Sequence, residues 1–249
     1  MSPTGITRRH VLTAAARVTA AASLTSTGLV ATPAAAAPQP LRNDELKEAL
    51  RRVEARRRRL LTSRPSANGW EMQKAADDGG DIVTRHVTGT GLKVPVRMGD
   101  PETVLVHVIR RFHYEVDTLG LRGEPNPVQG WVAPSAARNS RLPESNQASG
   151  TAVVVRPDFY PPGVRGGFTT TQQLIIRDIV ADTEGVVRWG GDDRRPYEGL
   201  FYLTVRPGDA RLARVAAKIR TWAETPGSGA GVVPDVTEPS RRRQAARYR

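Results

Sequence analysis

Apolar residues recur every three or four positions in four segments of the chain. This spacing predicts helices over residues 43–61, 100–119, 169–184 and 209–224. Start signals support each of them: Asn43, Asp100 followed by Pro101, the Thr169-x-x-Gln172 capping box and Asp209. We therefore expect four amphipathic helices, of which 100–119 has the clearest apolar stripe.

Short runs of β-branched residues lie between these helices. Residues 82–87 and 92–97 flank a Thr-Gly-Thr-Gly turn, which predicts a hairpin, and Gly130–Ala133 is a short strand candidate. Residues 186–187 and 200–205 enclose a charged loop, and residues 151–156 form another strand. Strands and helices in this order, with short connections, predict an α+β domain with a small antiparallel sheet flanked by helices.

The stretch Ser145–Arg156 has the composition of a binding site. A polar loop with Gly150 leads directly into a β-branched apolar strand. Polar groups at the mouth of a strand held by the core are well placed to meet a ligand, and glycine permits close approach. The charged loop after Trp189-Gly190-Gly191-Asp192 is the expected partner of this stretch.

Together the two stretches resemble the D-alanyl-D-alanine carboxypeptidases, zinc peptidases of the Hedgehog-type fold that cut peptide stems of the bacterial cell wall. The family's first motif is Ser-x-His-x-x-Gly-x-Ala-x-Asp, and its second has Trp-Gly-Gly-Asp followed by an acidic base three residues before a His ligand. The chain keeps the following motif residues: Ser145, Gly150, Ala152, Trp189, Gly190, Gly191, Asp192 and Glu198. The resemblance implies the same sheet with helices packed on it.

The three positions that hold zinc in the family carry other residues here. By this alignment they are Gln147, Val154 and Phe201. Valine and phenylalanine offer no lone pair, and the glutamine amide is a weak ligand for Zn²⁺. Without a metal-bound water, Glu198 at the base position loses that role. We therefore expect no cofactor and a non-catalytic relative of the family; zinc returns to consideration only if the ligand assignment is wrong.

The resemblance implies a groove around these positions. Its floor is expected to be apolar, and its candidate ligand-contacting residues are Arg138, Arg141, Ser145, Asn146, Gln147, Trp189 and Asp192. In the family an arginine upstream of the first motif holds the substrate carboxylate, a role open to Arg138 or Arg141. The alternative for both arginines is an ordinary surface loop, and Asp192 also suits a turn.

The N-terminus has the features of an export signal. Arg8 and Arg9 precede a mildly apolar run that ends at Ala34-Ala35-Ala36, which predicts a twin-arginine signal over residues 1–36, with Sec export as the alternative. The run is too weakly apolar for a membrane span. We expect a secreted or wall-associated bacterial protein, divided into a basic helix and linker (37–68), the peptidase-like domain (69–224) and a disordered basic tail (225–249).

Charge and composition limit the partners. The chain has 37 basic and 25 acidic residues and no cysteine. Three basic residues lie in the predicted signal, which leaves 34 and a formal charge of +9. The arginines gather at the ends, at 51–59 and 241–249, with no nucleic-acid motif and only 5% aromatic residues. A peptidoglycan peptide or another anionic wall polymer is therefore the expected partner, against nucleic acid; the oligomeric state is open.

Two histidines on the helix 100–119 are candidates for replacement ligands. His107 and His113 are six residues apart, a spacing that places them on different faces, so packing or surface histidines is the favoured interpretation.

Three functions follow from the sequence: a secreted module that binds wall peptide without cutting it; an active peptidase with unrecognised ligands; and a structural envelope protein whose groove is filled, with Phe201 as the plug.

Overall fold

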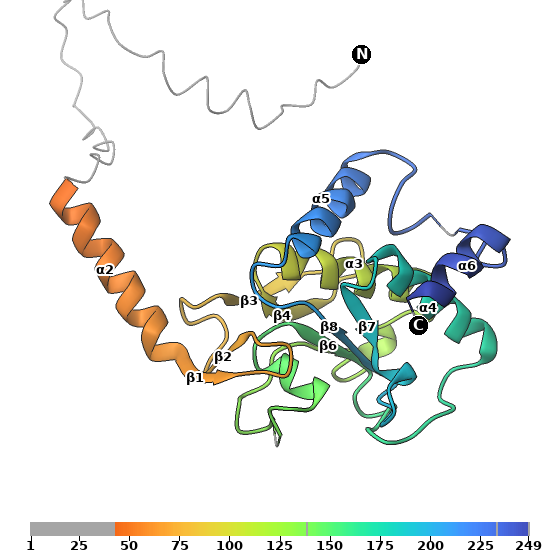
Figure 1. The fold of residues 1–249 in the computed structure, drawn as a ribbon, viewed down its shortest axis with the longest axis horizontal. Coiled ribbons are helices and arrows are strands. Elements are labelled where there is room, and N and C mark those ends of the chain that lie inside the picture. Colours follow the sequence, from red (N-terminus) through yellow and green to blue (C-terminus); the bar gives the residue numbers. More distant parts are fainter. Residues whose placement is uncertain (1–42, 138, 233, 249) are drawn as a thin grey trace, which may run out of the picture. The chain divides into compact units, whose positions relative to one another are not determined.

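A four-stranded antiparallel sheet is the centre of the fold in the computed structural model, which describes residues 43–137, 139–232 and 234–248 (Figure 1). Its strands are, in spatial order, β5 (Val128–Gln129), β6 (Ala152–Val155), β8 (Leu200–Leu203) and β7 (Val187–Trp189). Every neighbouring pair is antiparallel. The predicted α+β class is confirmed; the finer likeness to the D-Ala-D-Ala peptidase fold stays a prediction.

One face of this sheet carries the main core. Helices α3 (Asp100–Glu115), α4 (Thr170–Asp182) and α5 (Ala210–Glu224) contribute their apolar stripes to the same cluster as Val153, Phe201 and Leu203 of the sheet. From α3 the buried apolar residues of this cluster are Val104, Leu105, Val108, Ile109 and Phe112. Three of the four predicted helices thus form the core because each presents one apolar face to the sheet or to α3.

Two separate hairpins adjoin the sheet. The predicted pair forms β3 (Ile82–His86) and β4 (Lys93–Arg97), joined by the Thr-Gly-Thr-Gly turn. A second pair, β1 (Leu61–Pro65) with β2 (Glu71–Gln73), was not predicted from the sequence. The capping box at Thr169 is confirmed by its reciprocal hydrogen bonds with Gln172. Asp100, in contrast, lies in the first turn of α3, and the N-cap is Gly99.

Helix α2 (Asn43–Leu60) confirms the predicted N-terminal helix but not its burial. Only Leu60 is buried, and Leu46, Leu50 and Val53 are each about half exposed or more. The helix is tied to the body at its C-terminal end, where Arg57 forms an ion pair with Asp81 at 2.9 Å. None of the described helices has the length and apolar content needed to cross a membrane.

The tail was predicted to lack structure, and this prediction is wrong for its last part. Residues Pro239–Arg247 form helix α6, which packs against α4. Pro239 suits the first turn of a helix, and Ala245 is buried. The stretch has too little apolar content to fold alone, so polar contacts with the rest of the chain hold it in place.

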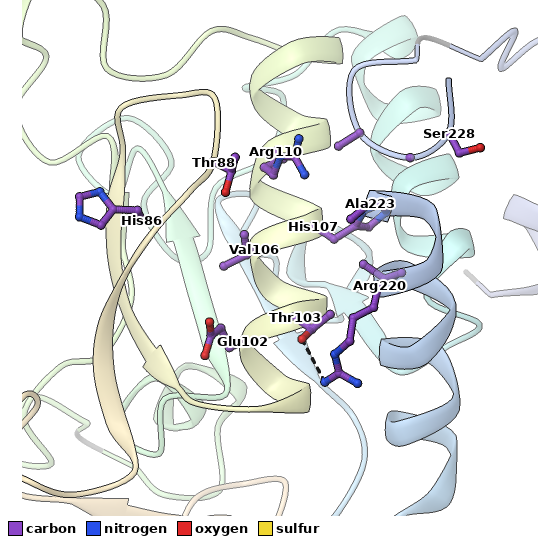
Figure 2. A pocket seen from close by; sticks show the side chains of 13 residues that line it. His86, Thr88, Glu102, Thr103, Val106, His107, Arg110, Arg220, Ala223 and Ser228 are labelled. Carbon is purple, nitrogen blue, oxygen red and sulfur yellow. Dashed lines mark hydrogen bonds between the residues drawn. The ribbon is translucent and has the colours of Figure 1, made fainter. Parts of the chain in front are cut away.

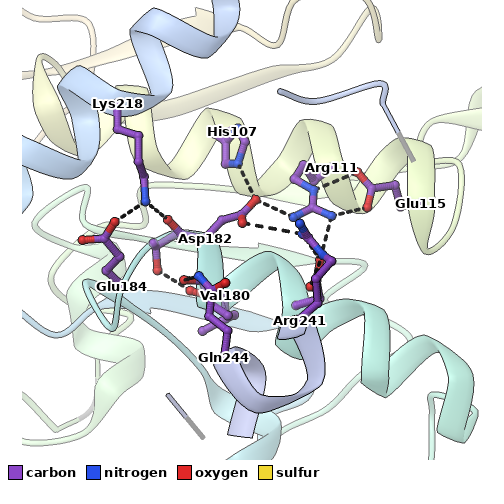
Figure 3. Close-up of polar contacts among 12 residues, drawn as sticks. His107, Arg111, Glu115, Val180, Asp182, Glu184, Lys218, Arg241 and Gln244 are labelled. Atoms are coloured by element: carbon purple, nitrogen blue, oxygen red, sulfur yellow. Dashed lines mark hydrogen bonds and ion pairs between the residues drawn. The ribbon is translucent and has the colours of Figure 1, made fainter. Parts of the chain in front are cut away.

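The polar contacts that hold α6 in place centre on the buried side chain of Arg111, which is 2% exposed (Figure 3). Arg111 donates to Glu115 of its own helix, to Asp182 at 2.6 Å and to Asp178 at 3.0 Å. Arg241 of α6 donates to both oxygens of Asp178, at 2.8 and 2.6 Å. We call these five residues the Arg111 cluster; it joins α3, α4 and α6 by charge-assisted hydrogen bonds.

Candidate functional site

The two stretches that carry the family resemblance lie side by side in the sheet. Strand β6 contains the end of the first motif, and β8 contains the last position of the second. The two strands pair directly: Ala152 with Tyr202, Val153 with Phe201 and Val154 with Leu200. Residues about 50 positions apart in the chain are thereby brought to one place.

This register corrects the assignment of Phe201. Side chains on neighbouring strands that pair directly share a face, so Phe201 lies with Val153, and Val154 lies with Leu200 on the other face. Phe201 is fully buried in the main core, 6.0 Å from Phe112 between ring centroids. It therefore neither plugs a groove nor stands near Val154. The position opposite Val154 is Leu200.

The face shared by Val154 and Leu200 carries a cavity of about 260 Å³. Ala152, Val154 and Leu200 form a small apolar cluster there, with Tyr197 and Tyr202 packed against it. The cavity is lined by Leu142, Pro143, Glu144, Pro162, Asp193, Arg194, Arg195, Pro196, Tyr197, Leu200 and Tyr202. We call it the sheet-face cavity. The predicted groove residues that the structure describes do not line this cavity, and Leu200 contributes apolar surface to it.

The polar groups of this cavity form a short chain of contacts. The Tyr202 hydroxyl donates to Asp193 at 2.9 Å, and Arg188 donates to the other Asp193 oxygen at 2.6 Å. Burial first, and then the charge of Asp193, raises the pKa of Tyr202, and burial raises the pKa of Tyr197 to about 12. Both tyrosines are therefore hydrogen-bond donors at neutral pH. At the rim, Arg195 lies 3.5 Å from Glu144, and Arg194 is exposed.

Ser145 and Asn146 do not face the cavity. They belong to the short 3₁₀ helix η2 (Pro143–Gln147) and are buried. The Ser145 hydroxyl accepts from the backbone N–H of Ala67 at 3.0 Å, and the Asn146 side-chain oxygen accepts from that of Asn68 at 3.1 Å. The expectation that they contact a ligand is wrong, because their polar groups hold the segment Ser66–Asn68 against the sheet.

The same structural use applies to Gln147 and Gly150. The Gln147 amide donates to the carbonyl oxygen of Gly130 at 3.0 Å. Gly150 has a φ of +69°, and a Cβ there would lie 2.7 Å from the backbone nitrogen of Arg97. Glycine is therefore required at position 150 by the contact between two segments of chain, in place of the ligand approach that the sequence predicted.

Glu198, at the position of the catalytic base, holds a loop. It is 5% exposed, and its two oxygens accept from the backbone N–H groups of Gly166 at 3.0 Å and Gly167 at 2.7 Å. Trp189 is also buried, and its indole nitrogen donates to the Glu198 carbonyl at 2.6 Å. Asp192 accepts from Arg177 at 2.7 and 3.1 Å. None of these three side chains lines the sheet-face cavity.

Of the remaining predicted residues, Arg141 is exposed, next to Leu142 at the edge of the cavity. Arg138 and the signal arginines Arg8 and Arg9 lie outside the described residues.

The donors present do not fit the zinc site that the resemblance implies. Val154 and its partner Leu200 are apolar, and the Gln147 amide is engaged with the backbone. Within the described residues there is no group of three or more His, Asp or Glu side chains placed to hold a metal ion. We therefore derive no chemical step through zinc.

Sequence reasoning missed the residues that line the cavity, chiefly Tyr197, Tyr202 and Asp193. One signal was available: side chains two residues apart on a strand share a face, so choosing Leu200 as the partner of Val154 would have selected Tyr202 as well.

Comparison of the chain with protein-family models, with curated proteins and with solved structures returned no match.

Proposed function

We propose that the chain binds a peptide fragment in the sheet-face cavity and does not hydrolyse it by the zinc mechanism. The observation that supports this most directly is the cavity's position, on the face where the two peptidase-like stretches meet and where apolar side chains occupy the paired positions Val154 and Leu200. The likeness of this region to the D-Ala-D-Ala peptidase fold is part of the same proposal.

The lining of the cavity suits the end of a peptide. At about 260 Å³ it is slightly smaller than ordinary small-molecule sites of roughly 300 Å³ and more, so it takes one or two residues. Leu200 and the tyrosine rings give an apolar floor. Arg194 and Arg195 at the rim offer the fork that carboxylates accept in a bidentate manner. A wall stem peptide that ends in a free carboxylate has this combination of groups, and export through the predicted signal would bring the chain to it.

Binding to purified muropeptides, measured by isothermal titration calorimetry, tests the proposal. Arg194→Glu reverses an exposed rim charge and is expected to weaken binding by roughly tenfold, since it places a carboxylate against the ligand's carboxylate. Arg243→Glu makes the same charge change on an exposed residue of α6, outside the cavity, and is expected to leave the affinity unchanged. Absence of binding by the unmodified protein at millimolar peptide contradicts the proposal.

Metal content separates this proposal from an active zinc peptidase. Elemental analysis of the dialysed protein is expected to find no stoichiometric zinc, and added Zn²⁺ is expected not to raise the melting temperature. About one zinc per chain, with hydrolysis of D-Ala-D-Ala peptides, would restore the enzymatic alternative.

A further inference from the structure

A second cavity, of about 250 Å³, lies between α3, α5 and the β3–β4 hairpin (Figure 2). It is enclosed by the β3–β4 hairpin, α3, α5 and residues 228–230, and it shares no lining residue with the sheet-face cavity. We call it the α3–α5 cavity. Among the residues that line it are Thr88, Thr103, Val106, Arg110, Ile219 and Ser228. Polar and apolar groups both contribute to its walls.

Arg110 is the unusual member of this set. Its Nε atom is buried, and within the described residues it has no hydrogen-bond acceptor. The other guanidinium nitrogens of Arg110 form no ion pair and no hydrogen bond with any described residue. The adjacent Arg111, in contrast, meets three carboxylates. A buried donor without an acceptor is costly and uncommon in folded proteins, which points to a group that the chain itself does not supply.

The other charged groups around the cavity already have partners. Glu102 lies 3.0 Å from Arg85, so its charge is compensated by a residue of the β3 strand. Arg220 is paired with Asp100 and donates to the Thr103 hydroxyl at 3.2 Å. The positive charge of Arg110 is therefore left without a counter-charge among the described residues.

His107 also lines the cavity, but its imidazole is directed at Asp182 of the chain itself. Its side chain is 4% exposed, and its Nε2 atom has no hydrogen-bond partner among the described residues. The nearest carboxylate oxygen, on Asp182, is 3.8 Å away, beyond hydrogen-bonding distance. The unmet buried donor on which this site rests is therefore the Nε atom of Arg110.

The walls define the kind of ligand. The hydroxyl group of Thr88 adds a donor, and Figure 2 shows Arg110 on the part of α3 that faces the turn carrying Thr88. Val106, Ile219 and Ala223 supply apolar surface. The volume exceeds that of a bare inorganic anion, so a ligand that fills it needs an apolar part as well as an anionic head.

We propose that the α3–α5 cavity is a binding site for a small organic anion. Its carboxylate or phosphate oxygens accept from the Arg110 guanidinium, and its apolar part packs against Val106 and Ile219. Arginine suits either head group because its planar fork matches both. This site is separate from the sheet-face cavity, and the proposal does not depend on peptide binding there.

Calorimetric titration of the full mature chain with butyrate, phenyl phosphate and inorganic phosphate, at constant ionic strength set with sodium chloride, tests this site. Butyrate and phenyl phosphate carry the two possible head groups on an apolar part, and at least one of them is expected to bind more tightly than inorganic phosphate. Butanol, the neutral analogue of butyrate, is expected not to bind. Equal weak effects of all four compounds would overturn the proposal.

Three variants locate the site. Arg110→Gln is expected to weaken binding by at least tenfold, whereas Arg110→Lys keeps a charge and retains part of the affinity. Arg243→Gln removes an exposed arginine of α6 outside the cavity and is expected to bind as the unmodified protein does. Melting temperatures without ligand verify that each variant is folded. Binding that survives unchanged in folded Arg110→Gln places the anion elsewhere and refutes the assignment.

Discussion

Val154 and Phe201 occupy neighbouring strands of one sheet, yet their side chains lie on opposite faces of it. The register pairs Val154 with Leu200 and Val153 with Phe201. Val154 therefore packs in the small apolar cluster with Ala152 and Leu200, whereas Phe201 packs edge-on against Phe112 in the main core. In this register the two side chains do not point toward a common site.

This relationship gives a stability prediction for the two positions. Phe201→Ala is expected to lower the free energy of unfolding by about 3–5 kcal/mol, because it leaves a void in the main core. Val154→Ala removes fewer carbons from the smaller cluster and is expected to cost about 1–2.5 kcal/mol. Urea unfolding followed by circular dichroism measures both. Equal losses at the two positions would contradict the assignment of Phe201 to the main core.

The helices were the most predictable part of the fold, for a local reason. The stripe of α3 and the Thr169–Gln172 capping box are encoded within single segments, so they can be recognised without knowledge of the rest of the chain. The β3–β4 hairpin is equally local, since its turn fixes its register.

The site was less predictable because it depends on register between distant strands. A shift of one residue moves a side chain to the other face of a sheet, and this is the error made at Phe201. Ser145 and Asn146 were misinterpreted for a related reason: their partners, in the segment Ser66–Asn68, are some 78 residues away in sequence. Polar residues beside a strand satisfy backbone groups as readily as they meet ligands.

The Arg111 cluster predicts a strong dependence of stability on one arginine. Arg111→Met is expected to lower the free energy of unfolding by about 3–5 kcal/mol, because it leaves the buried carboxylates of Glu115, Asp178 and Asp182 without this counter-charge.

Arg110→Met is the matched control on the same helix. Since the described residues give Arg110 no partner, its loss is expected to change the free energy of unfolding by less than about 1 kcal/mol. Chemical denaturation of both variants at pH 7 compares them. A loss at Arg110 as large as that at Arg111 would mean that Arg110 has a structural partner, and it would also count against the anion site.

The cluster also predicts how stability depends on pH through Asp182. Burial alone would raise its pKa, but the contact with His107 and the charge of Arg111 outweigh burial, so the pKa falls below its ordinary value of 3.8. A carboxyl whose pKa is lower in the folded state contributes stability that is fully present above 3.8 and is lost as the pH falls through the folded-state pKa.

Comparison with Asp182→Asn isolates this contribution. The difference in unfolding free energy between the unmodified protein and the variant is expected to be constant from pH 6 to pH 5 and to shrink as the pH is lowered from 4 to 2. Urea titrations at these pH values measure it. A difference that grows on acidification would show that Asp182 is not stabilised in its charged form.

The distance in sequence between α6 and α4 has a consequence for the order in which their contacts can form. The Asp178 carboxylate binds two arginines, Arg111 and Arg241, and Arg241 lies 63 residues after it in the chain. During synthesis, a chain that has emerged from the ribosome only as far as α4 or α5 therefore lacks one of the two arginines that bind Asp178. A chain that loses α6 to proteolysis retains that deficit, so the acidic residues of α3 and α4 couple the folding of the core to the presence of α6.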